Sequence, residues 1–258
     1  MGTRENQSDR TLERHTPRTL ANIGLRLMGS EGKVGKLRYK YLEAAALRTD
    51  IVILQVGAND GIFDDPLYPF FHKNPHVRGI LIEPQKGPYE KLLNLYRDNP
   101  NVTCVRTAIS ATTDYLSLWS VNLGEDPFGK AIARTNPEKF DYVMWRRPGK
   151  RLKGYEVESE DVPAAPLSDV LEELSVSPEQ ISAVFTDTEG SDIEVVNQLL
   201  NTGARPEVLQ YEHVIAGDEV VFETNRRLAG MGYELNWSFR DIFAALRAGA
   251  PAATPAVP

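Results

Sequence analysis

The residue types best suited to chemistry lie where apolar runs of the sequence end. Glu83, Asp187 and His213 each stand at or just after such an end, and Glu189 follows Asp187 by two positions. A carboxylate can take a proton from a reacting hydroxyl, and an imidazole titrates near neutrality, with a pKa of roughly 6.5. We therefore take Asp187, Glu189 and His213 as candidate catalytic bases.

Each of these residues also has a structural interpretation. Asp187 could cap the next helix or hold a cofactor, Glu189 could stabilise a first helical turn through the helix dipole, and His213 could simply pack at a strand end. Asp187 with Glu212 or His213 could also bind Mg²⁺ or Mn²⁺. Nothing in the sequence fixes such a geometry, so we expect no required metal.

A loop of small and polar residues, from Gly57 to Gly61, follows the first strong apolar run. Glycines in such a loop let a ligand approach the backbone. The loop lacks the later glycines of the dinucleotide motif G-x-G-x-x-G, and it lacks the G-K-[ST] ending of a P-loop. A pyrophosphate ligand is therefore poorly supported.

Glu83 lies 22 residues after Gly61, at the end of the next apolar run. A carboxylate in this position can accept hydrogen bonds from both ribose hydroxyls of an adenosine group. An adenosine ligand without phosphates, such as S-adenosylmethionine, suits this combination. The alternative is a simple turn between a strand and a helix, with Glu83 as a helix-capping acid.

Strand and helix patterns alternate along most of the chain. The predicted strands cover 51–56, 77–83, 101–108, 183–187, 207–211, 233–239 and 242–246. Between them, apolar residues recur at helical spacing. Asp65 is the predicted N-cap of one helix, and Ser191 is the predicted N-cap of another, in a capping box with Glu194. This alternation is typical of a parallel sheet with right-handed crossovers.

The composition is that of a globular protein of 258 residues with a formal net charge of −7. The acidic balance argues against a nucleic-acid partner, because proteins that bind the negative phosphates of nucleic acids usually carry an excess of basic residues. A single cysteine, Cys104, excludes an internal disulfide and suits a reducing compartment. No segment has the pattern of a secretory signal or a membrane span. We expect a soluble, cytoplasmic protein without a membrane partner.

We expect a disordered N-terminus at 1–15, a helical region at 16–50, a main domain at 51–247 and a flexible tail at 248–258. A basic insertion at about 122–155 interrupts the main domain.

Within the insertion, Trp145, Arg146 and Arg147 combine an aromatic ring with two guanidinium groups and are candidates for contact with an anionic substrate. A solvated loop is the alternative. A homodimer through the segment 20–47 is also left open.

Several ordered motifs resemble the FkbM family of S-adenosylmethionine-dependent methyltransferases. They are VGANDG at 56–61, LIEP at 81–84, FTDTEGSDIEVV at 185–196 and LQYEH at 209–213, and the segment 228–246 fits the family's ending. The resemblance implies a Rossmann-like class I methyltransferase fold, an α/β fold whose mostly parallel seven-stranded sheet has one antiparallel strand and helices on both faces. It also implies methyl transfer, usually to a hydroxyl oxygen of a sugar, natural product or related metabolite.

The resemblance also implies roles for individual residues. The loop Gly57-Ala58-Asn59-Asp60-Gly61 would line the methionine side of the cofactor. Glu83 would bind the ribose, and Thr107 and Ala108 would lie near the adenine.

Two positions depart from the family pattern. Gln55 stands where the family more often has aspartate, so a polar group is kept but the charge is lost. Phe185 precedes the D-x-E-G motif where family members often carry a lysine.

The expected function is therefore O-methylation of a small-molecule acceptor. The alternatives are a protein of the same fold that has lost catalysis and serves as an interaction partner, and a nucleotide-dependent oxidoreductase, which the missing glycines disfavour.

Overall fold

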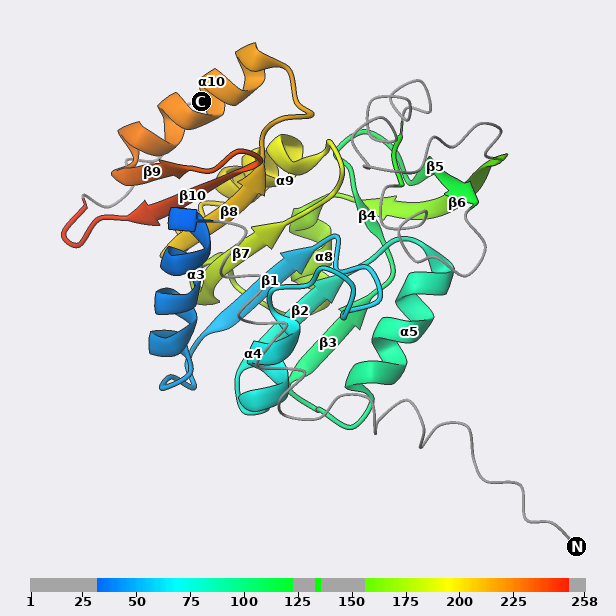
Figure 1. Ribbon diagram of the computed structural model, residues 1–258, viewed down its shortest axis with the longest axis horizontal. Helices are drawn as coiled ribbons and strands as arrows, with labels where there is room; N and C mark the ends of the chain where they lie inside the picture. The colour runs from blue at the N-terminus through cyan, green and yellow to red at the C-terminus, as the bar shows by residue number, and fades with distance from the viewer. Residues whose placement is uncertain (1–31, 123–132, 136–155, 251–258) are drawn as a thin grey trace, which may run out of the picture.

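The computed structural model describes residues 32–122, 133–135 and 156–250 (Figure 1). Several expectations fall outside these ranges. They concern the N-terminus at 1–15, the start of the helical region, most of the basic insertion with Trp145, Arg146 and Arg147, and the end of the C-terminal tail.

A seven-stranded sheet forms the centre of the described part (Figure 1). In spatial order its strands are β3 (Val102–Val105), β2 (Arg78–Ile82), β1 (Val52–Val56), β7 (Ile181–Thr186), β8 (Val208–Glu212), β10 (Asp241–Leu246) and β9 (Tyr233–Trp237). β10 runs antiparallel to both of its neighbours, and the remaining pairs are parallel. This arrangement confirms the mostly parallel sheet of the class I methyltransferase fold.

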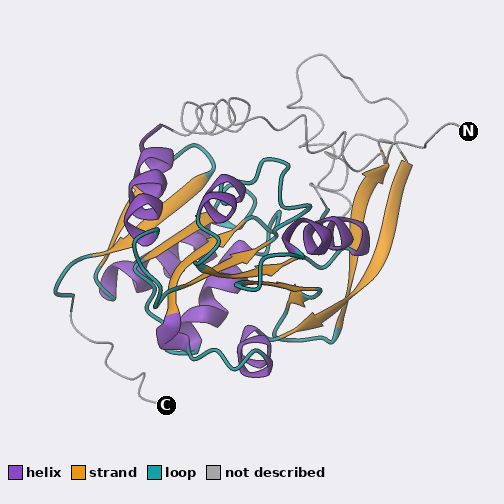
Figure 2. Ribbon diagram, turned by 90° about the horizontal axis from the view of Figure 1, so that it is seen from below, coloured by secondary structure: helices purple, strands orange, loops and turns teal. Residues whose placement is uncertain are grey.

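Helices cover both faces of the sheet (Figure 2). One face packs against α3 (Gly32–Ala45), α4 (Tyr68–Lys73) and α5 (Lys86–Tyr96), and the other packs against α8 (Leu167–Glu173), α9 (Asp192–Asn201) and α10 (Asp218–Gly230). Successive side chains of a strand point to opposite faces. Ile53 accordingly joins the first core, while Val52 and Leu54 join the second. Burial on both sides explains the continuous apolar run at 51–54.

A smaller sheet stands beside the central one (Figure 1). It contains β4 (Ala108–Ile109), β6 (Glu156–Ala165) and β5 (Tyr115–Asn122) in that order. The prediction of one strand over 101–108 was therefore wrong at its end, because β3 stops at Val105 and Ala108 pairs with Ala164 in the second sheet.

The structure confirms Ser191 as the N-cap residue of α9 but does not confirm Asp65 as that of α4, whose N-cap is Leu67. α4 begins at Tyr68, and the Asp65 carboxylate accepts a hydrogen bond from the Leu67 N–H at 2.7 Å just before it. Ser191 is the N-cap residue of α9 but its side chain makes no capping hydrogen bond, so the capping box is absent. Asp192, one position later, accepts hydrogen bonds from the hydroxyl and the N–H of Thr188 instead.

Gly57 offers a test of how tightly β1 and β7 meet. Its φ is +85°, and a Cβ there would lie 2.0 Å from the carbonyl oxygen of Asp187. We expect Gly57→Ala to lower the free energy of unfolding by about 2–4 kcal/mol, from backbone strain and overpacking together. The measurement is denaturant-induced unfolding. Gly87→Ala in α5, where a Cβ meets nothing within 4 Å, is the matched control and should be neutral or stabilising. Equal free energies of unfolding in the two variants would contradict the close packing of Gly57 against Asp187.

Candidate active site

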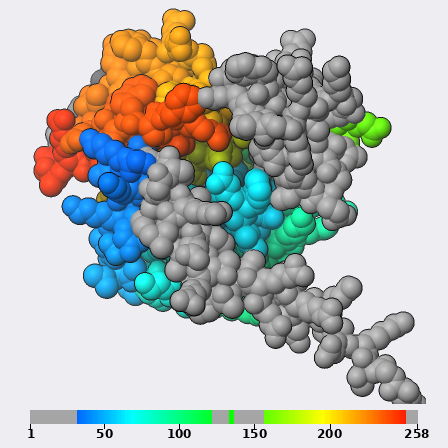
Figure 3. Space-filling model, in the orientation of Figure 1, coloured from blue at the N-terminus to red at the C-terminus, as the bar shows by residue number. Residues whose placement is uncertain are grey.

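A cavity of about 840 Å³ opens at the carboxyl ends of the central strands. It lies where the chain order reverses between β1 and β7, which is the place where open α/β sheets bind ligands. In Figure 3 this region appears between the orange and red β9–β10 hairpin and the cyan segment that follows β1. The volume is typical of a small-molecule site.

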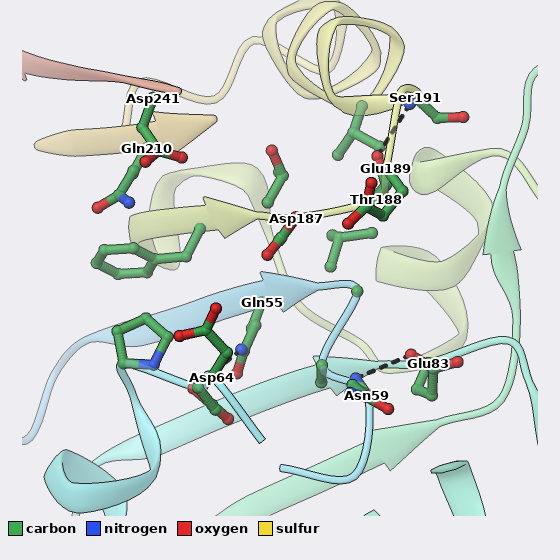
Figure 4. Close-up of a pocket in the computed structure, with 18 of the residues that line it drawn as sticks. Gln55, Asn59, Asp64, Glu83, Asp187, Thr188, Glu189, Ser191, Gln210 and Asp241 are labelled. Atoms are coloured by element: carbon green, nitrogen blue, oxygen red, sulfur yellow. Dashed lines mark hydrogen bonds between the residues drawn. The ribbon is translucent and has the colours of Figure 1, made fainter. Parts of the chain in front are cut away.

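The loop after β1 forms one wall of the cavity, with Gly57, Ala58 and Asn59 among the lining residues. The N–H groups of Gly57 and Ala58 donate to the Ile82 carbonyl oxygen at 2.9 and 3.0 Å, which fixes the loop against β2. Asn59 has a positive φ of 48° and directs its N–H to the Glu83 carboxylate at 2.9 Å (Figure 4). The backbone of this loop is therefore held in one conformation.

Glu83 lines the cavity and is only 3% exposed. One carboxylate oxygen accepts the Asn59 N–H and the other accepts the Gln85 N–H at 2.8 Å. Burial raises the pKa of Glu83 to about 7, although the two backbone donors act in the opposite direction. Each oxygen keeps a lone pair for a further donor, such as a ribose hydroxyl.

Two of the predicted cofactor residues shape the loop and do not line the cavity. The Asp60 carboxylate accepts the N–H groups of Ile62 and Phe63 at 3.0 and 2.8 Å, which forms a local turn. Gly61 lies against the side chain of Leu92 in α5, where a Cβ would come within 2.6 Å.

The predicted adenine residues Thr107 and Ala108 do line the cavity. Ile109 and two residues of β5, Leu116 and Leu118, extend this wall and make it apolar. The second sheet therefore supplies a surface against which a flat heterocycle could pack.

Asp187 lies at the end of β7, and its carboxylate points into the cavity (Figure 4). Asp187 is exposed to the open cavity, although many protein atoms surround its carboxylate. Desolvation by these atoms and the nearby carboxylates of Glu189, Asp192 and Glu212 hold its pKa well above the usual range, while Arg240 acts in the opposite direction. Asp187 is therefore a carboxylate with an elevated affinity for a proton.

Glu189 lines the cavity but is held by two arginines. It forms an ion pair with Arg134, which is 4% exposed, and Arg240 lies 3.9 Å away. Arg240 also pairs with Glu212 at 2.7 Å. Arg134 comes from the short described segment 133–135, which pairs with Trp119 of β5 through two backbone hydrogen bonds. An alternating series of charges thus links four segments of the chain near Asp187.

The structure does not place His213 among the lining residues of this cavity. Its ring packs edge to face against Trp237, with 5.1 Å between the ring centroids. The backbone N–H of His213 donates to the carbonyl oxygen of Arg240 at 2.9 Å. In this conformation the imidazole supports the β9–β10 turn.

Sequence reasoning missed several residues that line the cavity. Arg38 of α3 is 4% exposed and donates to the Gln210 side chain at 3.0 Å. No sequence signal distinguishes this arginine from those on a solvent-exposed helix face. Phe239 and Asp241 were also missed, and they line the rim at the β9–β10 turn next to Trp237.

The chemistry of the lining fits S-adenosylmethionine, whose sulfonium and ammonium groups are cationic. Asp64, Asp65, Glu83 and Asp187 all line the cavity and complement positive charge. Within the described ranges, no group of three or more His, Cys, Asp or Glu side chains is placed to hold a metal ion. No helix among the described residues is long and apolar enough to cross a membrane.

Comparisons with solved structures return methyltransferases at low sequence identity and low TM-score. The O-methyltransferase TomG from Streptomyces achromogenes, involved in tomaymycin synthesis and solved in complex with S-adenosylmethionine, is 14% identical over 91% of this chain and 92% of its own, with a TM-score of 0.42. A precorrin-6y C5,15-methyltransferase from Geobacter metallireducens is 12% identical over 85% and 92%, with the same TM-score. No curated protein matches the chain.

Residues 55–247 match the methyltransferase FkbM domain. The match covers the loop after β1, Glu83, the β7–α9 loop and the β9–β10 turn, which are the segments that surround the cavity. The chain therefore belongs to the FkbM family of methyltransferases, whose cofactor is S-adenosylmethionine.

Proposed function

We propose that the protein transfers the methyl group to a hydroxyl oxygen of a small-molecule acceptor, with Asp187 as the general base. The observation that carries this proposal is the Asp187 carboxylate, which is open to the cavity and has a raised pKa. A base with such a pKa holds a proton more readily than an ordinary aspartate, which suits proton removal from a hydroxyl near neutral pH.

In this proposal Glu83 and the apolar wall hold the adenosine part of the cofactor, and the loop after β1 lines its methionine part. Glu83 accepts the ribose hydroxyls, and the apolar wall of Ala108, Ile109 and Leu116 packs against the adenine. The backbone N–H of Asn59 donates to the Glu83 carboxylate and so fixes the position of the loop relative to that carboxylate.

When bound, S-adenosylmethionine would supply an electrophilic methyl group on a sulfonium, with the neutral thioether as the leaving group. The acceptor oxygen forms the new bond to carbon, and Asp187 takes the hydroxyl proton. The cavity walls must hold that oxygen in line with the methyl group, at about 3 Å, and exclude water.

The charges around Asp187 favour a hydroxyl over a carboxylate acceptor. Glu189 and Asp192 already raise the pKa of Asp187 through their negative charge. A carboxylate acceptor would add a further charge of the same sign, which is unfavourable in a buried site. A neutral hydroxyl carries no such penalty until its proton moves to Asp187.

We assign Glu189 a positioning role, since Arg134 and Arg240 both engage it. Contact of Trp145, Arg146 and Arg147 with an anionic part of the acceptor stays a prediction, as does the homodimer.

Glu83→Gln tests the cofactor site. Loss of a charge-assisted hydrogen bond should weaken S-adenosylhomocysteine binding about 10- to 100-fold. Because the pKa of Glu83 is about 7 and the ionised form is the better acceptor, wild-type affinity should rise as the pH increases through about 7, and the variant should lose this dependence. Calorimetry measures both effects.

Glu90→Gln, on the exposed surface of α5, is the matched control and should bind like the wild type. Unchanged affinity in Glu83→Gln would remove Glu83 from the cofactor site.

Asp187→Asn tests the base. With S-adenosylhomocysteine formation followed over a panel of glycosides and phenols, we expect kcat to fall about 10²- to 10⁴-fold. Cofactor affinity should change only a few-fold. Asp187 must be ionised to accept a proton. The wild-type rate should therefore fall on the acidic side of the pH–rate profile, at a pH above the usual carboxylate range. The variant should not show this fall.

Asp169→Asn in the first turn of α8 is the control, since that carboxylate does not line the cavity. A variant that loses cofactor affinity but keeps its kcat at saturating cofactor would show that Asp187 holds the cofactor and is not the base.

A further inference from the structure

Two aromatic side chains stand exposed on the rim of the cavity. Trp237 is 53% exposed at the end of β9, and Phe239 is 69% exposed in the turn that follows. Both line the same cavity as Asp187. Large apolar side chains gathered at the mouth of a site mark a surface that a ligand covers, because water contact with them is unfavourable.

The turn that carries these rings is rigid. The Ser238 N–H donates to the Asp241 carbonyl oxygen at 2.7 Å, and the Asp241 N–H donates to the Ser238 hydroxyl at 2.8 Å. The ring of His213 packs edge to face against Trp237 and restrains its orientation. A recognition surface held in place before binding loses little conformational entropy when a ligand arrives.

The position of the turn assigns it to the acceptor and not to the cofactor. Arg240, the residue after Phe239, pairs with Glu212 at the end of β8 and lies 3.9 Å from Glu189. The turn therefore adjoins the Asp187 side of the cavity. Glu83, which is proposed to bind the ribose, follows β2. In the sheet, β2 lies on one side of β1 and β7 lies on the other.

We propose that Trp237 and Phe239 form the acceptor subsite and bind a ring with an apolar face that bears the hydroxyl to be methylated. This inference rests on the proposed function and extends it to the class of acceptor. Aromatic side chains stack on flat or puckered rings through dispersion and C–H or π contacts. Ser238 and Asp241 lie beside them in the cavity wall and can bond hydroxyls at the ring edge.

A ring of this kind can come from a sugar or from an aromatic compound, and three probes with neighbouring hydroxyls separate the sources. They are methyl β-D-glucopyranoside, 4-methylcatechol and the open-chain 1,2-hexanediol. Saturation-transfer NMR on the full chain with S-adenosylhomocysteine should show contact with the ring protons of at least one cyclic probe, about fivefold stronger than with the diol. The stronger cyclic probe identifies the source.

Trp237→Ala and Phe239→Ala should each reduce the ring signal about fivefold. Phe222→Ala is the matched control, because Phe222 is 64% exposed on α10 and lies outside the cavity lining. Since both rim residues are exposed, the melting temperatures should stay close to that of the wild type.

Ring signals no stronger than that of the diol, or unaffected by Trp237→Ala, would overturn the acceptor subsite. Calorimetric binding of S-adenosylhomocysteine reports on the proposed function separately. It should be equal in the wild type and Trp237→Ala, and its absence from the wild type would count against the cofactor site and not against the ring subsite.

Discussion

The close approach of β1 and β7 is the constraint on which the site depends. The Asp187 N–H donates to the Val56 carbonyl oxygen at 3.0 Å, and the next residue of each chain segment enters a loop that lines the cavity. Only a residue without a side chain fits at Gly57, because the Asp187 carbonyl oxygen occupies the place of a Cβ. The loop after β1 and the loop that carries Asp187 are thus fixed to each other at one point.

This geometry concentrates carboxylates in a place with little water, and the protein bears a cost for it. Burial raises the pKa of Asp65, Glu83 and Glu212 to about 7 each, above an unfolded value of roughly 4.3 or lower. The folded chain then binds more protons than the unfolded one between those values, so stability is fully present below them and declines as the pH rises toward 7. A cationic ligand offsets this loss, which couples stability to occupancy of the cavity.

Much of the fold followed from local patterns, while the site depended on contacts between distant segments. The continuous apolar run at 51–54 identified β1, and the polar loop after it predicted the cavity wall at Gly57. The β5–β6 pair was missed because β6 is largely exposed and polar and has no clear alternation. Arg38 could not be found, since its partner Gln210 is 172 positions away. Ala108 was placed in the wrong strand because an apolar run does not reveal which sheet it joins.

The two walls of the cavity come from different halves of the chain. Residues from β1 to β5 form the side with Glu83, Thr107 and Ala108, and residues from β7 to β10 form the side with Asp187, Trp237 and Phe239. The halves meet along the β1–β7 pair, where hydrogen bonds join the two parallel backbones. Evolution can therefore vary the second half and explore new acceptors while the first half keeps its cofactor, and a designer could graft the β9–β10 turn of one family member onto another for the same purpose.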